Sequence, residues 1–288
     1  MALGNDMPKI SVLINTLNEE KNLPYALRSV KPWAGEIVVV DMYSEDRTVE
    51  IARDYGAKVF FYDRMGFVEP ARAYAIEQAT GDWMLILDAD ELVPPPLAHR
   101  LRSIALEDKA DVVLIPRLNY LLGAPLVASG WGANQDKHAR FFKRGMLETS
   151  SRIHAFLTPK PQARALELAY RPGEAVIHFN YVDVEQFIEK LNRYTNIEAK
   201  QALERSKAAS PAGVILKVIL EFLNRYLRRG GYKDGWRGFY LAGLMAMYRW
   251  ATFAKLAELK AVGERGQVEN LYRLEAERIL AQYTNGAE

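Results

Sequence analysis

The first hundred residues alternate short β-rich runs with helical patterns, and this alternation restricts the fold more than any other feature of the sequence. Strands are expected over residues 10–15, 36–41, 58–62 and 83–87, with helices between them over 19–30, 45–55 and 67–79. Such an order is typical of βαβ units, whose strands align in parallel. The runs 37–40 and 83–87 are continuously apolar, as expected of central strands that helices cover on both faces. The sequence therefore predicts an α/β fold with a mainly parallel, Rossmann-like sheet.

The rest of the chain divides into an irregular part and a helical part. One more strand is expected over residues 111–116, after which Gly, aromatic residues and Arg become frequent. That composition suits loops and short strands around a binding cleft. The pattern is almost wholly helical later on, with helices expected over 184–206, 213–229, 236–259 and 267–283. We therefore expect an α/β domain over residues 1–182 and a helical extension over 183–288.

The composition excludes several classes of protein. The chain has 288 residues, 49% of them hydrophobic, which is enough for one large domain with an appendage. A formal net charge of +2 gives no reason to expect a nucleic-acid partner. Because cysteine is absent, no disulfide framework or thiolate site can form. No run reaches the roughly 18 uncharged apolar residues of a spanning helix, and the N-terminus has no signal-peptide core, so we expect a cytoplasmic protein.

Two carboxylates follow the expected strand 83–87. The two-residue period of extended backbone predicts that Asp88 and Asp90 lie on the same side at the C-terminal end of that strand. Ligands bind at this end in open α/β sheets, and hard oxygen ligands suit Mg²⁺ or Mn²⁺. The alternative is a solvated acidic turn. A neighbouring strand that also ends in an aspartate, Asp41, favours a ligand site.

Polar residues follow the first two strands as well. A carboxylate at Asp41 can accept a hydrogen bond from a nucleobase or a ribose hydroxyl, whereas Ser44 or Asp46 can simply cap the next helix. Residues 16–20 open the preceding helix, where backbone and side-chain groups can meet a nucleotide. The same residues also fit an ordinary capping arrangement. These segments favour a nucleotide site but leave the helix-cap interpretation open.

The chain resembles the family 2 glycosyltransferases, in particular the branch that adds sugars to lipopolysaccharide core or related glycolipids. The matching segments cover most of the chain and are residues 16–20, 37–41 with Ser44, Asp46 and Thr48, 80–91, 130–131, 140–142, 178–181, 190–194 and 230–238. The resemblance implies a GT-A fold, a nucleotide-sugar donor and inversion at the anomeric carbon. It also implies nucleotide or phosphate contacts at Thr16, Asn18, Glu19, Asp41, Ser44 and Arg72, with Asp88 and Asp90 at the ribose and the metal.

The chain departs from this branch at two places. Arg72 is followed by Ala73 where the branch has Asn, and His154 is followed by Ala155 where the branch has Glu. The second departure leaves the general base open, because an acceptor hydroxyl needs a carboxylate or an imidazole to take its proton. Asp136 is the leading candidate and His154 is the alternative. Asp136 also fits a solvated aspartate in a polar loop.

Further polar residues extend the expected site. His178 follows a strand-like run and can bring an imidazole to the metal, although a buried structural histidine fits equally well. Arg140, Lys190 and Arg193 are candidate phosphate cations. Lys190 and Arg193 lie three residues apart, so they share one helix face, which is also typical of a solvated charged surface.

The expected helix over 213–229 is strongly amphipathic. Its apolar residues oppose Lys217, Arg225, Arg228 and Arg229. Such a helix can lie in a membrane interface with its arginines at anionic headgroups. Packing on the α/β domain, or on a second subunit of a homo-oligomer, explains the same pattern.

Together these observations predict an inverting hexosyltransferase that moves a sugar from a UDP-linked donor to a glycolipid or lipid-linked saccharide. Mn²⁺ or Mg²⁺ assists, and the enzyme works at the inner face of the cytoplasmic membrane. Residues 1–117 form the donor half of the catalytic domain and residues 118–182 form the acceptor half. One alternative is a non-catalytic scaffold that binds sugar nucleotides or membranes. Another is a nucleotidyltransferase, although that class prefers a Gly-rich phosphate loop after its first strand.

Overall fold

The computed structural model describes residues 7–66, 68–148, 157–205 and 210–285. The chain divides into two compact units. The first contains Met1–Gln186 and Arg225–Leu241, and the second contains Phe187–Asn224 and Ala242–Glu288. The first unit therefore includes a short segment from the C-terminal helical region as well as the α/β domain.

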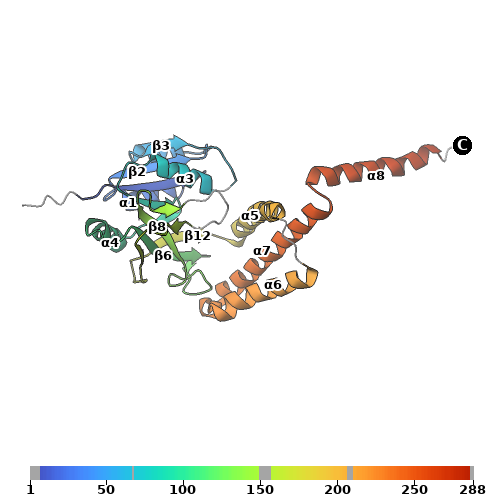
Figure 1. Ribbon diagram of the computed structural model, residues 1–288. Helices are drawn as coiled ribbons and strands as arrows, with labels where there is room; N and C mark the ends of the chain where they lie inside the picture. The colour runs from blue at the N-terminus through green and yellow to red at the C-terminus, as the bar shows by residue number, and fades with distance from the viewer. Residues whose placement is uncertain (1–6, 67, 149–156, 206–209, 286–288) are drawn as a thin grey trace, which may run out of the picture. The chain divides into compact units, whose positions relative to one another are not determined.

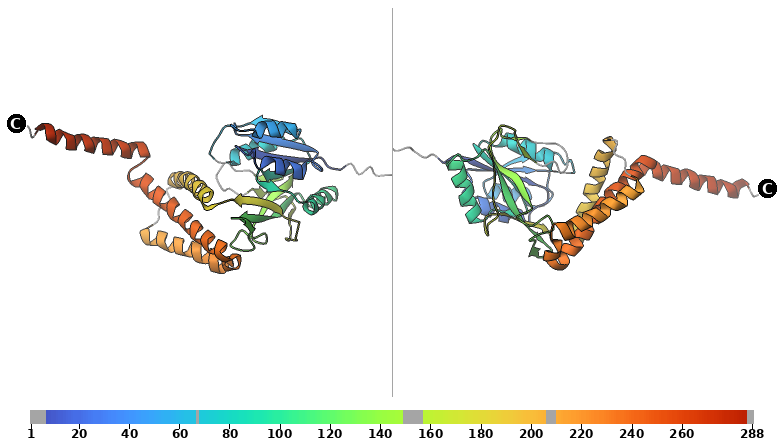
Figure 2. Two further views of the ribbon diagram at one scale, coloured as in Figure 1. Left: turned by 180° about the vertical axis from the view of Figure 1, so that it is seen from behind. Right: turned by 60° about the horizontal axis from the view of Figure 1, so that its bottom comes forward.

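A ten-stranded sheet forms the centre of the first unit, and its main path runs β3-β2-β1-β4-β8-β6-β12-β5 (Figures 1 and 2). The strands on this path are β1 (Ile10–Thr16), β2 (Glu36–Asp41), β3 (Lys58–Phe61), β4 (Trp83–Asp88), β5 (Glu91–Leu92), β6 (Val112–Leu121), β8 (Lys137–Lys143) and β12 (Val176–Tyr181). Strands β3, β2, β1 and β4 pair in parallel, whereas β8 is antiparallel to β4 and β6. Two short strands, β7 (Ala124–Pro125) and β11 (Ala165–Glu167), also pair with β6. The sheet is mostly parallel, as predicted.

Helices cover both faces of this sheet (Figure 1). These helices are α1 (Leu23–Val30), α2 (Thr48–Asp54), α3 (Glu69–Gln78) and α4 (Pro95–Leu106). Because side chains alternate along a strand, Ile14 belongs to the core under α1, α2 and α4, whereas Leu13 belongs to the core under α3. The same alternation assigns Leu87 and Ile86 of β4 to opposite faces. The prediction of helices on both faces is confirmed.

Strand β6 is longer than the sequence predicts. The pattern indicates a strand over residues 111–116, but the observed strand continues to Leu121. Pairing with β12 and β7 satisfies the backbone of this extension, although its sequence is not continuously apolar. Two polar residues, Arg117 and Asn119, consequently lie two positions apart on extended backbone. A separate two-stranded sheet contains β9 (Leu147–Glu148) and β10 (Thr158–Pro159).

The C-terminal region is helical, as predicted. It contains α5 (Val184–Glu204), α6 (Pro211–Leu223), α7 (Gly235–Ala261) and α8 (Arg265–Asn285). The expected helix over 213–229 is regular only to Leu223, after which Asn224–Arg228 forms a π-helical turn and Gly231–Asp234 a 3-10 turn. None of the helices in the described part of the chain combines the length and the hydropathy that a membrane span requires.

Candidate active site

The loops that follow β1 and β2 are joined by side-chain hydrogen bonds. The Asn18 N–H donates to Ser44 Oγ at 2.8 Å, and Asn18 Oδ1 accepts from the Glu45 N–H at 2.8 Å. The Glu19 N–H donates to Thr48 Oγ1 at 2.8 Å. Asn18 has a φ of 57°, a left-handed conformation that asparagine tolerates better than most residues. Three of the predicted nucleotide-contact residues, Asn18, Glu19 and Ser44, therefore hold these loops together.

Asp41 ends β2 and is fully buried. Its carboxylate accepts hydrogen bonds from Thr16 Oγ1 at 2.8 Å, from the Ser44 N–H at 2.7 Å and from Ser44 Oγ at 2.6 Å. A carboxylate has about four acceptor positions, so the chain itself uses three of them. About one acceptor position remains for a ligand. Thr16 and Ser44 contact Asp41 directly, which the sequence did not indicate.

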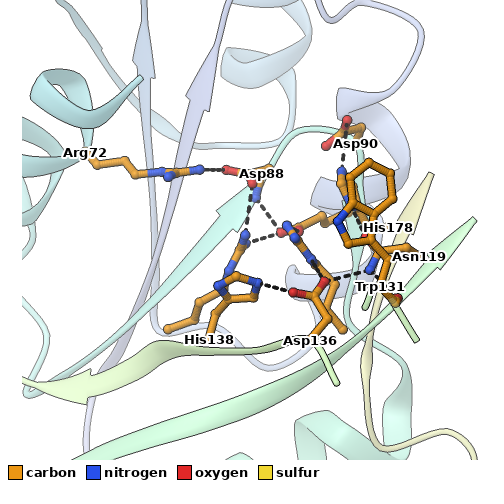
Figure 3. Close-up of polar contacts among 11 residues, drawn as sticks. Arg72, Asp88, Asp90, Asn119, Trp131, Asp136, His138 and His178 are labelled. Carbon is orange, nitrogen blue, oxygen red and sulfur yellow. Dashed lines mark hydrogen bonds and ion pairs between the residues drawn. The ribbon is translucent and has the colours of Figure 1, made fainter. Parts of the chain in front are cut away.

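Asp88 ends β4 and bonds two arginines, of which Figure 3 labels Arg72. Arg72 of α3 donates to Asp88 Oδ1, and Arg140 of β8 donates to Oδ2 at 3.1 Å. Burial by itself would raise the pKa of this carboxyl, but the charges of Arg72 and Arg140 outweigh burial and hold the pKa well below its ordinary value. Asp88 therefore stays ionised, with both oxygens already bonded.

The extended backbone of β4 ends at Asp88, and the chain turns directly afterwards at Ala89 and Asp90. The two-residue period therefore does not apply to Asp90, and a shared side for the two carboxylates stays a prediction. One carboxylate oxygen of Asp90 lies 3.5 Å from His178 Nε2. His178 comes from β12, where it pairs with Glu91 of β5. The structure thus brings together two of the predicted metal ligands, Asp90 and His178, beside the C-terminal edge of β4.

Asn119 fixes the orientation of the His178 ring (Figure 3). Its amide nitrogen donates to the Trp131 carbonyl at 2.8 Å and to Asp136 Oδ2 at 2.6 Å. Both partners only accept hydrogen bonds, so Asn119 Oδ1 must face His178 Nδ1, which lies 2.7 Å away. His178 Nδ1 consequently carries the hydrogen. In the neutral imidazole, Nε2 then has the lone pair that faces Asp90.

Asp136, the leading candidate for the general base, is held by three partners. Its carboxylate accepts from Arg117 Nε at 2.9 Å and from Asn119, and it bonds His138 Nε2 at 2.7 Å. Burial alone would raise the pKa of Asp136, but His138 and Arg117 outweigh it and hold the pKa well below its ordinary value. Such a carboxylate is a weak proton acceptor, so this geometry favours a positioning role. The alternative base, His154, lies outside the described residues.

The charges around Asp88 balance one another. Glu91 is fully buried, accepts from the Asp88 N–H at 2.9 Å and pairs with Arg140. Burial would lower the pKa of Arg140, but the carboxylates of Glu91 and Asp88 outweigh it and raise that pKa. The ion pairs join three arginines to three carboxylates, and these residues are Arg72, Arg117, Arg140, Asp88, Glu91 and Asp136. Asp90 has no arginine partner among the described residues, so its negative charge is not balanced in this way.

Two buried hydrogen-bond donors beside the site have no partner among the described residues. They are Asn15 Nδ2 and Arg72 Nε. Asn15 lies on β1 opposite Asp88 of β4. A buried unpaired donor costs about 1–3 kcal/mol, so such groups often have a functional role.

An aromatic pocket of about 340 Å³ lies beyond the ends of β2 and β3. It is lined by Tyr43, Phe61, Tyr62, Asp63, Met65 and Tyr74. The rings of Tyr43 and Phe61 stack with their centroids 5.4 Å apart. Tyr43 has a φ of 59°, which is costly for an aromatic residue and keeps its side chain beside the pocket.

The sequence did not single out Asn15, Glu91, Arg117, Asn119 and His138 as site residues. A signal existed for Arg117 and Asn119, because residues at a two-residue spacing in a strand share one face. The two other predicted phosphate cations, Lys190 and Arg193, lie on α5 in the second unit. Arg193 is exposed there and its guanidinium lies 4.9 Å from the ring centroid of Tyr194. Their role at a phosphate remains a prediction.

Comparison with known proteins identifies the class. The profile of Glycosyl transferase family 2 matches residues 11–156. The chain is 28% identical over 256 residues to an uncharacterized glycosyltransferase of Rickettsia bellii, a match that covers 87% of each protein. It is also 28% identical over 273 residues to the lipopolysaccharide core biosynthesis glycosyltransferase LpsC of Rhizobium meliloti, which covers 92% of this chain and 98% of LpsC.

Among solved structures, S. aureus TarS in complex with UDP is similar, with a TM-score of 0.45 and 18% identity over 86% of this chain and 89% of that one. The chain belongs to glycosyl transferase family 2, and the protein is therefore a glycosyltransferase. The resemblance read from the sequence is confirmed. The mostly parallel sheet with helices on both faces agrees with the GT-A fold implied by that resemblance.

Proposed function

We propose that this glycosyltransferase moves a hexose, with inversion, from a UDP-linked donor to a glycolipid or lipid-linked saccharide, assisted by Mn²⁺ or Mg²⁺. Family membership supports the reaction class. The proposal that a metal assists the reaction rests on Asp90 and His178. The carboxylate oxygen of Asp90 lies 3.5 Å from His178 Nε2. A carboxylate oxygen and an imidazole nitrogen together suit Mn²⁺ well and Mg²⁺ acceptably.

The donor set of this structure fits a weakly held divalent metal. No group of three His, Cys, Asp or Glu side chains in the described ranges is arranged to hold a metal ion. Asp90 and His178 would hold the metal, and water and the donor diphosphate would complete its shell. The bound metal would neutralise negative charge on the departing diphosphate. Because the carboxylates around Asp88 are balanced by arginines, we expect metal affinity to depend strongly on the diphosphate.

Other residues of the site would hold the nucleotide. Asn15 Nδ2 and Arg72 Nε are buried donors without a protein partner in the described chain, so they suit carbonyl or hydroxyl oxygens of the nucleoside. Asp41 keeps about one acceptor position, which suits a base N–H or a ribose hydroxyl. The stacked rings of Tyr43 and Phe61 offer an apolar face to a base. Asp88 would act by holding Arg72 and Arg140 in place.

The step that activates the acceptor remains a proposal. Asp136 is the candidate base within the described residues, and His154 is the candidate outside them. The partners of Asp136 make it a weak base, so we propose that it mainly positions Asn119. A readout of metal affinity separates this role from proton transfer, because a base contributes to turnover alone.

The acceptor is proposed to be presented at a membrane surface. Five apolar side chains of α6 are 40% to 56% exposed, and these are Ile215, Leu216, Ile219, Leu220 and Leu223. Their spacing places them along one side of the helix. A helix with such a face can lie in a bilayer interface without crossing it. The relative LpsC is a lipopolysaccharide core biosynthesis glycosyltransferase, and lipopolysaccharide core is a lipid-anchored saccharide.

Donor turnover tests the proposed function. The purified protein is incubated with a panel of nucleotide sugars that includes UDP-glucose, with and without Mn²⁺, and release of the nucleotide is measured. We expect release from a UDP-sugar that needs the metal. Release from none of the sugars, with intact binding of UDP, would instead support a non-catalytic sugar-nucleotide scaffold. Formation of a nucleotide sugar from a sugar phosphate would support a nucleotidyltransferase.

A further inference from the structure

One aspartate of the C-terminal segment holds a loop of the α/β domain within the first unit. Asp234 lies in the 3-10 turn, and its Oδ1 accepts from the Val127 N–H at 2.7 Å. Its Oδ2 accepts from the Ala128 N–H at 3.2 Å and from Ser129 Oγ at 2.6 Å. A single carboxylate thus binds donors of three consecutive residues. Such charge-assisted bonds are about twice as strong as neutral ones.

Neighbouring residues of the same segment reinforce this contact. Arg225 Nη1 donates to the Ser129 carbonyl at 3.0 Å, and its guanidinium lies 5.6 Å from the ring centroid of Trp131. The Arg229 carbonyl accepts from the Ser129 N–H at 3.1 Å. Ser129 is fully buried with a φ of 62°, a conformation that costs energy for a non-glycine residue. The segment therefore maintains an unfavourable backbone geometry at Ser129.

Hydrogen bonds connect the loop at residues 127–131 to the His178 ring. The Trp131 N–H donates to the Ala128 carbonyl at 3.0 Å, so Trp131 belongs to the same turn. The Trp131 carbonyl accepts from the amide of Asn119, and that amide bonds His178 Nδ1. A continuous path of hydrogen bonds consequently connects Asp234 to His178 through Trp131 and Asn119.

We propose that Asp234 is a positioning residue for the Asp90 and His178 pair. It fixes the turn at residues 127–131, the turn fixes the Asn119 amide, and Asn119 fixes the ring nitrogen that faces Asp90. The inference rests on the proposed function in taking Asp90 and His178 as the metal ligands. Partners that orient a metal-binding histidine typically change metal affinity by 10–100-fold when they are removed.

The test uses the full-length Asp234→Asn variant, in which one of the two accepting oxygens becomes an NH₂ group. Because the NH₂ group cannot accept a hydrogen bond, the variant loses the bond from either the Val127 N–H or the Ala128 N–H, depending on which oxygen is replaced. Hydrogen exchange of the peptide over residues 127–131 measures how stable the turn is. Calorimetric titration of Mn²⁺ in the presence of UDP measures metal binding by Asp90 and His178. We expect roughly tenfold faster exchange and roughly tenfold weaker Mn²⁺ binding. Asp54→Asn, which changes an exposed aspartate of α2, is the matched control and should alter neither.

Ser129→Ala removes one of the three bonds and serves as a milder variant, in case Asp234→Asn does not fold. It should shift both readouts in the same direction by a smaller factor. Faster exchange with unchanged Mn²⁺ affinity would overturn the proposal, because Asp234 would then support only the loop. Unchanged exchange would overturn it as well. Wild-type protein that binds neither UDP nor Mn²⁺ would contradict the proposed function itself, whatever the exchange of the variants.

Discussion

His178 Nδ1 lies 2.7 Å from Asn119 Oδ1, and this contact decides which nitrogen of the imidazole is available at the site. The amide of Asn119 is committed to the Trp131 carbonyl and to Asp136, so it cannot rotate without losing both bonds. His178 Nε2 is therefore directed to Asp90 before any ligand arrives. Preorganisation of this kind reduces the cost of assembling a metal site when the substrate binds.

Replacement of Asp136 distinguishes a positioning residue from a base. Asp136→Asn keeps the size of the side chain but brings an NH₂ group among the donors of Arg117, Asn119 and His138. We expect both Mn²⁺ affinity in the presence of UDP and donor turnover to fall, each by about tenfold or more. If turnover falls a hundredfold or more while Mn²⁺ affinity stays at the wild-type value, Asp136 is the base after all.

Replacement of Asp41 tests the nucleotide side of the site. Asp41→Ala leaves Thr16 Oγ1 and both donors of Ser44 without their buried acceptor. We expect weaker binding of uridine without metal, and a loss of about 1–3 kcal/mol in the free energy of unfolding. Calorimetry with uridine and chemical denaturation measure the two effects. Wild-type affinity for uridine in this variant would show that Asp41 only holds the loop.

Glu36, which lies outside the candidate site, makes the stability of the fold depend on pH. It is buried at the start of β2 and bonds Lys58 Nζ at 2.7 Å and the Thr80 N–H at 2.8 Å. Burial would raise its pKa, but Lys58, Ser11 and Thr80 outweigh burial and lower the pKa from 4.5 to about 2. A lowered folded-state pKa stabilises the fold above the unfolded-state value, and this stabilisation is lost as the pH falls from about 4.5 to about 2.

The comparison with Glu36→Gln isolates this contribution. At pH 7 we expect the variant to be less stable by up to about 3 kcal/mol, since each pKa unit corresponds to about 1.4 kcal/mol. The difference should shrink as the pH falls and vanish near pH 2. Denaturation at several pH values measures it. A difference that is the same at pH 7 and pH 3 would mean that packing, not ionisation, distinguishes Glu36 from Gln.

The exposed face of α6 yields a prediction for membranes. In the variant Leu216→Ser with Leu220→Ser, we expect clearly weaker co-flotation with anionic liposomes, because each change removes apolar area that would enter the interface. Leu271→Ser with Leu274→Ser, on the exposed surface of α8, is the matched control. Unchanged flotation of the α6 variant would withdraw the membrane proposal. A shift from oligomer to monomer in that variant would assign the face to a second copy of the chain.

The strands and helices of this protein can be predicted because each depends mainly on the pattern of neighbouring residues in the sequence. Strand β4 and its terminal Asp88 are visible as an apolar run that ends in a carboxylate. Asp90 shows where local reasoning fails, since its position depends on a turn that the two-residue period does not reveal. The direction of an acidic side chain after a strand is set by the next few backbone angles, and these have no strong sequence signal here.

Contacts between residues that lie far apart in the chain could not be predicted from the sequence. Asn119 meets Asp136 only because β6 and β8 pair in one particular register. Asp234 meets Val127 across 107 positions of the chain, and no periodicity connects such residues. Pairings of this kind follow from the tertiary fold, so the sequence alone identified Asp136 as a candidate base without its partners.

The most direct measurement of the proposed site is a calorimetric titration of Mn²⁺ with and without saturating UDP. It compares wild-type protein with Asp90→Ala and His178→Ala, and uses Asp54→Ala as the control. Because the proposed ligand pair supplies a single carboxylate, the wild type should bind Mn²⁺ weakly alone and at least about tenfold more tightly with UDP. Both site variants should lose this gain while they keep affinity for uridine. Wild-type Mn²⁺ affinity with UDP in either variant would contradict the assignment of Asp90 and His178 as the metal ligands.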